Sequence, residues 1–246
     1  SKIILEGPKE ELDLTENTQP AIFLISYSIF KLIKKEFNID LNQAKYFAGH
    51  SLGEYSALSS AGYLNFSNTI KLLRIRGFAM QNAIPKGEGG MIAILGSTID
   101  IIEKILKDNM NNFKIQIAND NSEGQIVLSG RINDLDKLIE TLKFNNIRFI
   151  KLPVSAPFHC QLMSKATEIM KKEIESANFT DAKNVLISNV TANEVSNKDE
   201  LKRLLIEQIE NRVRWRESII NIINKGVNHF IEIGPGKVLS GLVKRI

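Results

Sequence analysis

The chain has 246 residues, of which 43% are hydrophobic and 24% are charged, as in ordinary globular proteins. Its formal net charge of +4 is mild and its lysines and arginines are scattered, which argues against nucleic acid as a partner. No apolar run reaches the roughly 18 residues of a membrane span, so no membrane association is expected. A single cysteine, Cys160, and the lack of a signal-peptide pattern predict a cytoplasmic protein.

The first part of the chain predicts a helix followed by a short strand. Apolar side chains lie on nearly all sides of residues 21–37, which is typical of a helix enclosed within a domain. A polar loop over residues 38–43 then leads to a short strand over residues 44–48. Because a helix is expected directly after this strand, the chain has to turn sharply between the two.

The sharp turn contains Gly49, Ser51 and Gly53 in the Gly-x-Ser-x-Gly spacing of a nucleophile elbow. Such a turn forces strained backbone angles on Ser51, and we expect that only residues without a Cβ fit at positions 49 and 53. The Ser51 hydroxyl would stand above the N-terminus of the next helix, where the N–H of Leu52 can donate to an oxyanion. This arrangement suits acyl chemistry; the alternative is an ordinary glycine turn between strand and helix.

A further helix, expected over residues 67–84, carries an arginine in an apolar setting. The residues three and four positions away from Arg76 are Leu72, Leu73, Ala79 and Met80. A guanidinium on an apolar face is costly unless an anion meets it, so Arg76 is a candidate receptor for a carboxylate. The alternative is that the side chain extends its head group to solvent.

Residues 88–154 predict a second unit with the element order strand, helix, strand, strand, helix, strand. The expected strands cover residues 91–95, 113–118, 125–129 and 148–153, and the expected helices cover residues 99–109 and 133–145. This order is that of the ferredoxin-like fold. We therefore expect an α/β protein in which a ferredoxin-like domain, 88–154, is inserted into a discontinuous core, 1–87 and 155–246. The core is expected to be α/β-hydrolase-like with a short parallel sheet.

A serine at such a turn needs a general base, and the chain has three histidines. His50 precedes the serine, so its side chain should point away from the serine and pack. His229 lies in an expected strand over residues 229–233, where a lone histidine is more often structural. His159 lies in a loop punctuated by prolines and has no periodic reason to be buried, so it is the best candidate. No cluster with the spacing of metal ligands is visible in the sequence.

Four motifs follow one another along the chain, and together they are far more specific than any one of them. They are Gly49-His50-Ser51-Leu52-Gly53-Glu54-Tyr55, Arg76-Gly77-Phe78-Ala79-Met80-Gln81, Pro153-Val154-Ser155-Ala156-Pro157-Phe158-His159 and Glu232-Ile233-Gly234-Pro235-Gly236-Lys237-Val238-Leu239. In this order they closely resemble the motifs of the malonyl-CoA:acyl carrier protein transacylase family. The resemblance covers essentially the whole chain.

The resemblance implies a two-step acyl transfer that supplies fatty acid biosynthesis. Ser51 attacks the malonyl thioester while His159 takes its proton, and coenzyme A leaves behind a malonyl-serine ester. The phosphopantetheine thiol of acyl carrier protein then attacks the ester, again with His159 as base. The implied partners are therefore malonyl-CoA and acyl carrier protein, no metal or redox cofactor is expected, and the protein is expected to be a monomer.

The resemblance also implies roles for residues around the serine and the histidine. Arg76 would hold the malonyl carboxylate, and the backbone carbonyl of Gln208 would orient His159. Gln19 matches a further family glutamine near the site. Phe158, directly before the histidine, crowds the side of the pocket where a 2-methyl branch would project, which favours malonyl as the acyl group.

One part of the family pattern is missing from this sequence. The family begins with a strand ending in Gly-Gln-Gly-Ser-Gln, whose glutamine N–H forms the other half of the oxyanion hole, and this sequence starts after it. Two alternatives therefore stay open. One is a serine hydrolase of the α/β-hydrolase type with His229 as its histidine, and the other is a truncated, non-catalytic module that docks a carrier protein.

Overall fold

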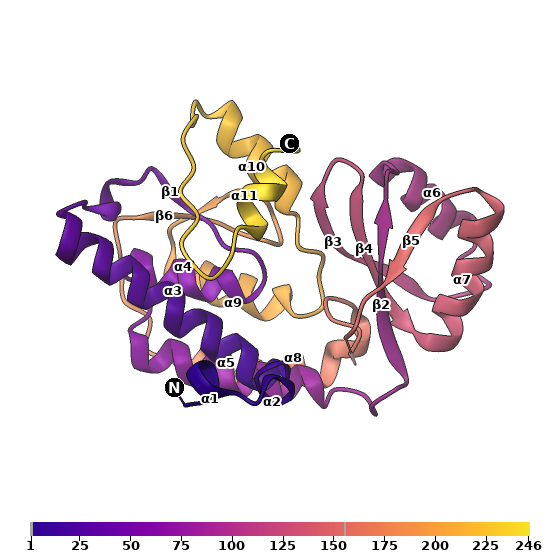
Figure 1. Cartoon of the computed structure of the whole chain (residues 1–246), viewed down its shortest axis with the longest axis horizontal. Helices are drawn as coiled ribbons and strands as arrows, with labels where there is room; N and C mark the ends of the chain where they lie inside the picture. The colour runs from indigo at the N-terminus through magenta and orange to yellow at the C-terminus, as the bar shows by residue number, and fades with distance from the viewer. Residues whose placement is uncertain (1, 155) are drawn as a thin grey trace.

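The computed structural model describes residues 2–154 and 156–246 and forms an α/β fold with two separate sheets (Figure 1). The expected α/β class is confirmed. Residues 1 and 155, at which the two expected segments of the larger domain begin, lie outside the described residues.

The smaller sheet has the strand order β1-β6-β7. Its strands are β1 (Tyr46–Phe47), β6 (Val185–Ile187) and β7 (Glu194–Val195). Strands β1 and β6 run parallel, as expected, but β7 runs antiparallel to β6, so the sheet is mixed and the expected short parallel sheet is limited to the β1–β6 pair. The expected strand over residues 229–233 does not form. An apolar run makes a strand only where a neighbour completes its hydrogen bonds, and residues 229–231 are exposed.

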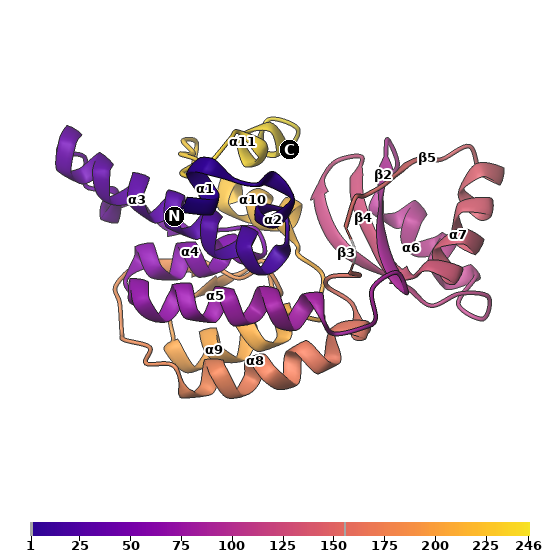
Figure 2. The same ribbon diagram turned by 60° about the horizontal axis from the view of Figure 1, so that its bottom comes forward.

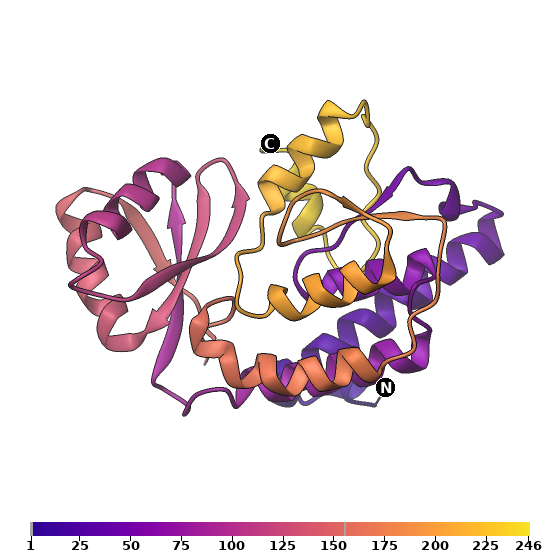
Figure 3. The ribbon, with the colours of Figure 1, turned by 180° about the vertical axis from the view of Figure 1, so that it is seen from behind.

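Helices make up most of the rest of this part of the molecule (Figure 2). They are α1 (Lys2–Glu6), α2 (Lys9–Leu12), α3 (Thr15–Phe37), α4 (Leu52–Ala61), α5 (Phe66–Gln81), α8 (Ser164–Ser176), α9 (Lys198–Gln208), α10 (Trp215–Asn224) and α11 (Val238–Val243), with short 3₁₀ turns η1 (Leu41–Gln43) and η2 (Gln161–Met163). Helix α5 contacts α3 on one side and α8 on the other, and α8 runs beside α9 (Figure 3). No helix within the described ranges is both long and apolar enough to cross a membrane.

Helix α3 is not enclosed by the domain, contrary to expectation. Its buried residues form one stripe, at positions 19, 23, 26 and 30, with the spacing of a single helical face. Leu32 is 50% exposed and Phe37 is 69% exposed. The composition of the segment is apolar all round, but within the described part of the helix only this stripe is fully buried.

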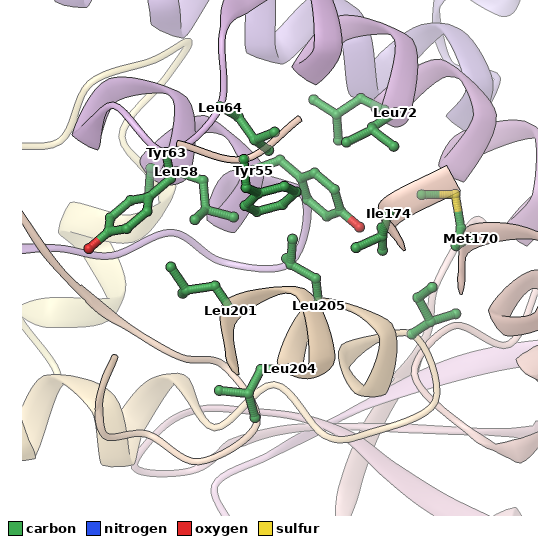
Figure 4. Close-up of a cluster of buried hydrophobic side chains, with 14 of the residues drawn as sticks. Tyr55, Leu58, Tyr63, Leu64, Leu72, Met170, Ile174, Leu201, Leu204 and Leu205 are labelled. Carbon is green, nitrogen blue, oxygen red and sulfur yellow. The ribbon is translucent and has the colours of Figure 1, made fainter. Parts of the chain in front are cut away.

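The main hydrophobic core holds the helix that follows Ser51. Figure 4 shows Tyr55 and Leu58 of α4 lying above Leu201 and Leu205 of α9, and all four side chains are at most 1% exposed. Fully burying a large apolar side chain stabilises the fold by about 1.5–3 kcal/mol. The position of α4, and with it the turn at its N-terminus, is therefore set by the core.

The second sheet is antiparallel throughout, with the strand order β3-β4-β2-β5. Its elements follow the chain as β2 (Gly89–Leu95), α6 (Ile99–Asp108), β3 (Ile115–Ser122), β4 (Gln125–Arg131), α7 (Ile132–Phe144) and β5 (Arg148–Lys151). The expected order of strands and helices is present. Strand β3 runs on to Ser122, four residues beyond the expected end of this strand at residue 118.

The two faces of this sheet pack differently because side chains alternate along a strand. Ile92 and Ile94 of β2 lie in a cluster with residues of α6 and α7. Met91 and Ala93 lie in another cluster, against which Phe158 packs. One face is thus covered by helices, and the other faces the chain segment that contains His159.

Strand β3 connects the second sheet to the rest of the molecule. The N–H of Asp120 donates to the carbonyl of Val213 (2.9 Å), and the N–H of Val213 donates to the carbonyl of Ala118 (2.8 Å). The Asp120 carboxylate accepts from Arg216 of α10 (3.1 Å from Nε to each oxygen), and it is only 1% exposed. These contacts fix the second sheet against α10.

Candidate active site

The turn at Ser51 is strained in the way its spacing predicts. Ser51 lies between β1 and α4 and has φ 54° and ψ −112°. A Cβ at Gly49 would lie 2.0 Å from the carbonyl oxygen of Gly53, so a glycine is required at position 49. At Gly53 a Cβ would meet no atom within 4 Å. The expectation that position 53 also requires glycine is therefore wrong, because the close approach is to the backbone of Gly53 and not to its α-carbon substituent.

A side chain from beyond β6 holds the turn in this conformation. Asn189 Oδ1 accepts from the N–H of Ser51 (2.7 Å), and its Nδ2 donates to the carbonyl of Gly49 (2.7 Å). Both backbone groups lie in the strained turn, where no regular ladder can pair them. Sequence reasoning missed Asn189, and nothing in its local pattern singles it out.

Ser51 and His159 lie 108 positions apart in the sequence, yet the Ser51 Oγ is 2.8 Å from His159 Nε2. The other ring nitrogen, Nδ1, is 2.8 Å from the carbonyl oxygen of Gln208. A carbonyl only accepts, so we assign the proton of the neutral ring to Nδ1. Nε2 is then left to accept the hydrogen of the serine hydroxyl.

His159 is nearly fully buried and neutral. Burial and the positive charge of Arg76 lower the pKa of His159 to about 3. The imidazole is consequently unprotonated at any pH at which proteins usually work, which is the state needed to accept a proton from serine.

Arg76 is 1% exposed, so the alternative that its head group reaches solvent is wrong. Its guanidinium donates to Gln19 Oε1 (2.7 Å), Gln208 Oε1 (2.8 Å) and Ser51 Oγ (3.1 Å), and it lies 5.5 Å from the centre of the Tyr55 ring. All three acceptors are neutral. Within the described part of the chain no carboxylate forms an ion pair with Arg76, and its Nε has no hydrogen-bond partner. The site thus contains a buried cation with no direct counter-ion.

The remaining predicted residues lie around this group. Leu52 is the first residue of α4, in the helical turn whose N–H groups have no acceptor within the helix. Phe158 is half-buried beside His159, and its carbonyl accepts from the hydroxyl of Ser129 (2.6 Å). Hydrogen bonds therefore join five of the predicted residues directly: Ser51, His159, Arg76, Gln19 and Gln208. Leu52 and Phe158 belong to the site because they are adjacent in the chain to Ser51 and to His159.

Among the described residues, the side chains of the other two histidines form no hydrogen bond with the Ser51 hydroxyl. His50 Nε2 lies 2.7 Å from Asn121 Oδ1 of β3, and its ring packs against Trp215, as expected for a packing role. His229 is exposed and outside regular structure. The hydroxyl of Ser51 therefore has His159, not His229, as its histidine partner. Within residues 2–154 and 156–246, no three His, Cys, Asp or Glu side chains are grouped so that they could hold a metal ion.

One buried carboxylate at the site was not singled out by the sequence. Glu54, three residues after Ser51 and 2% exposed, accepts from the side chain of Gln208 and from the N–H of Asn189 (3.2 Å). Its position in the first turn of α4, on the same side as the serine, is the one local signal that could have drawn attention to it.

A strained serine that is hydrogen-bonded to a neutral histidine, on an α/β fold, defines the class of proteins that form acyl-serine esters. Comparison with known proteins narrows this class. The chain belongs to the acyl transferase domain family, whose model matches residues 1–245.

Relatives and solved structures similar to this chain include malonyl transferases. The chain is 44% identical to the malonyl CoA-acyl carrier protein transacylase of Bacillus subtilis, over 100% of this chain and 77% of that protein. Among solved structures, the acyl-carrier-protein-S-malonyltransferase of Bartonella henselae superposes with a TM-score of 0.95 at 42% identity, over 99% of this chain and 78% of that one. A malonyl-transacylase in complex with a type II polyketide synthase acyl carrier protein gives a TM-score of 0.93 at 34% identity, over 99% and 78%.

Proposed function

We propose that this protein transfers the malonyl group from malonyl-CoA to the phosphopantetheine thiol of acyl carrier protein, as an S-malonyltransferase of fatty acid biosynthesis. The names of its relatives support the substrate and the carrier. The single observation that carries the proposal is the Ser51–His159 hydrogen bond of 2.8 Å beside the buried guanidinium of Arg76.

In the first step the Ser51 oxygen attacks the thioester carbonyl carbon, and its proton passes to His159 Nε2. The carbon–sulfur bond then breaks, the departing thiolate of coenzyme A takes this proton, and a malonyl ester of Ser51 remains. In the second step the phosphopantetheine thiol gives its proton to Nε2 and attacks the ester carbonyl, and Ser51 leaves with the proton. The carbonyl of Gln208 supports the imidazolium that forms in both steps, since it accepts from Nδ1 at 2.8 Å. The proposed sequence uses no metal and no redox cofactor.

Arg76 is proposed to hold the malonyl carboxylate. Support comes from its burial and from the neutrality of its three acceptors, because a carboxylate would give the guanidinium the counter-ion that it lacks. Gln19 would keep the guanidinium in place from the other side. Phe158 is proposed to narrow the pocket against a 2-methyl branch, in line with its place directly before His159.

The N–H of Leu52 is proposed to donate to the oxyanion of the tetrahedral intermediates. Support comes from its place at the start of α4, where N–H groups and the helix dipole favour negative charge. In this proposal the strained turn at Ser51 would bring the tetrahedral intermediate beside this N–H.

For the fold, we propose that residues 88–154 form a ferredoxin-like domain inserted into an α/β-hydrolase-like core of residues 1–87 and 155–246. The β2-α6-β3-β4-α7-β5 order and the antiparallel strand order β3-β4-β2-β5 support the first assignment. A strand, a strained serine turn and a helix in succession support the second. The monomeric state and the cytoplasmic location stay predictions.

Mass spectrometry of the protein after exposure to malonyl-CoA tests the function. We expect one malonyl group on Ser51, no adduct in Ser51→Ala, and loss of the adduct when acyl carrier protein bearing its phosphopantetheine is added. Binding of the carrier protein without any adduct from a thioester would instead support a non-catalytic docking module.

A further inference from the structure

We infer that Glu54 is a positioning residue for acyl transfer: its carboxylate orients Gln208, and through Gln208 it positions both the histidine and the arginine of the site. The inference rests on the proposed function for its reaction, and on the hydrogen bonds among the described residues for its geometry.

The contacts of Glu54 run to two different parts of the chain. One carboxylate oxygen accepts from the side-chain amide of Gln208, the last residue of α9. The other accepts from the N–H of Asn189, 3.2 Å away, beyond the end of β6. Glu54 itself lies in the first turn of α4. A single buried carboxylate therefore joins the ends of three elements at the site.

Gln208 in turn contacts His159, Arg76 and the main chain of Ser51. Its main-chain carbonyl accepts from His159 Nδ1 (2.8 Å), and its side-chain Oε1 accepts from Arg76 (2.8 Å). Its Nε2 donates to the carbonyl of Ser51 (3.0 Å) as well as to Glu54. Glu54 fixes the orientation of the amide together with Arg76 and the Ser51 carbonyl, because the carboxylate and the carbonyl only accept and face Nε2, whereas the guanidinium only donates and faces Oε1.

The burial of the Glu54 carboxylate requires an explanation, because burying a charged group costs free energy. Glu54 is 2% exposed and forms no ion pair within the described ranges. Two N–H donors facing two oxygens require acceptors at both positions, which the ionised carboxylate supplies and an amide of the same shape cannot. The side-chain amide of Gln208 lies between Glu54 and Arg76 and is hydrogen-bonded to both, so it links the carboxylate to the guanidinium.

The Glu54 carboxyl changes its protonation state in a pH range in which activity can be measured. Burial raises the pKa of Glu54 to about 7, against the hydrogen bonds from Gln208 and Asn189 and the charge of Arg76, which favour the carboxylate. Among the described residues, Tyr55 and His159 are titratable groups near it that do not change charge near this pH. Burial raises the pKa of Tyr55 to about 12, and His159 is neutral with a pKa of about 3.

The test measures single-turnover acylation of Ser51 by malonyl-CoA between pH 6 and pH 9. In the wild-type protein we expect the rate to fall as the pH drops through about 7, because protonation turns one of the two Glu54 oxygens into an O–H donor that faces the N–H of Gln208 or Asn189. Glu54→Gln should lower the rate at pH 8 about tenfold to a hundredfold and flatten the profile between pH 6 and pH 8. Glu175→Gln, at an exposed ion-paired position of α8, should match the wild type.

A second variant covers the case in which Glu54→Gln does not fold, as judged by circular dichroism. Gln208→Ala keeps the main-chain carbonyl but removes the link to Glu54, so it should also lose the pH dependence near 7. The inference is overturned if either folded variant keeps the wild-type pH profile, or if Glu54→Gln keeps the wild-type rate.

A probe without a malonyl group separates this inference from the proposed function. Phenylmethylsulfonyl fluoride sulfonylates an activated serine: the serine oxygen bonds to sulfur, the sulfur–fluorine bond breaks, fluoride leaves, and His159 takes the serine proton as in acyl transfer. Slower labelling of Ser51 in Glu54→Gln would support the positioning role even if malonyl-CoA left the wild-type protein unmodified. In that case the proposed function alone would be wrong. Unchanged labelling would overturn the positioning role.

Discussion

The Nδ1 atom of His159 lies 2.8 Å from the main-chain carbonyl oxygen of Gln208, 49 positions further along the chain. Gln208 ends α9, and the last carbonyls of a helix have no N–H partner within it. The C-terminal end of a helix is also its negative end, which favours the imidazolium that forms when the serine loses its proton. The orientation of the base is therefore provided by the end of a helix, and no side-chain substitution at position 208 removes the carbonyl.

The histidine assignment predicts different results for two histidines. His159→Ala should lower the rate of Ser51 acylation by malonyl-CoA by about 10²–10⁴, the usual contribution of a general base. His229→Ala should match the wild type, because His229 is exposed and has no contact with Ser51. Stopped-flow acylation with both variants checks this, and loss of turnover in His229→Ala alone would restore the hydrolase alternative.

The two arginines of α5 offer a matched pair for the carboxylate site. Arg76→Ala should reduce acylation by malonyl-CoA, relative to acetyl-CoA, about tenfold to a hundredfold, because a buried charge-assisted hydrogen bond is lost. Arg74→Ala should leave this ratio unchanged, since Arg74 is half exposed and pairs with Glu16. The ratio of kcat/KM for the two thioesters is the measurement. An equal decrease of kcat/KM for both thioesters would mean that Arg76 does not bind the malonyl carboxylate.

The two glycines of the Ser51 turn should behave differently. Gly49→Ala introduces a methyl 2.0 Å from the carbonyl oxygen of Gly53, and should destabilise the turn by about 1–3 kcal/mol and abolish acylation. Gly53→Ala adds a methyl in open space within a helix, and should stabilise by up to about 1 kcal/mol. Urea unfolding and Ser51 labelling measure both effects. A destabilised Gly53→Ala would contradict the geometry of the turn.

Acid should destabilise the protein partly through His159. Its pKa falls from 6.5 in the unfolded chain to about 3 in the folded protein, so the unfolded state binds more protons between these values. The contribution of the neutral ring is thus complete above pH 6.5 and is lost as the pH falls toward 3. At pH 4.5 the loss is about 2–3 kcal/mol relative to pH 7. Urea unfolding at both pH values should show a smaller difference in His159→Gln, and an equal difference in both proteins would refute this account.

The core beneath α4 should be needed for the fold that carries the site. Leu58→Ala removes a fully buried side chain and should cost about 2–5 kcal/mol of unfolding free energy. Leu32→Ala, at a position that is 50% exposed on α3, should cost far less. Thermal denaturation of the two variants gives the comparison, in which similar losses would contradict the described core.

Several features could be predicted from the sequence because they depend on residues that are close together in the chain. A serine between two glycines after a short strand predicts the strained turn, because few residues can approach a backbone that closely. An arginine among apolar neighbours on a helix predicts a buried cation, and Arg76 is 1% exposed. The resemblance to known transacylases added Gln19 and Gln208, which no local pattern distinguishes. The strand and helix order of residues 88–154 followed from periodicity alone.

Tertiary packing decided the rest, because it joins residues whose separation along the chain carries no signal. The link from Glu54 to Gln208 spans 154 positions and the link from Asn189 to Ser51 spans 138, and neither contact has a periodicity or a turn pattern behind it. The same holds for the antiparallel β7 and for residues 229–231, which stay outside any sheet. Apolar patterns say that a segment needs a partner, whereas only the folded chain determines which partner it finds.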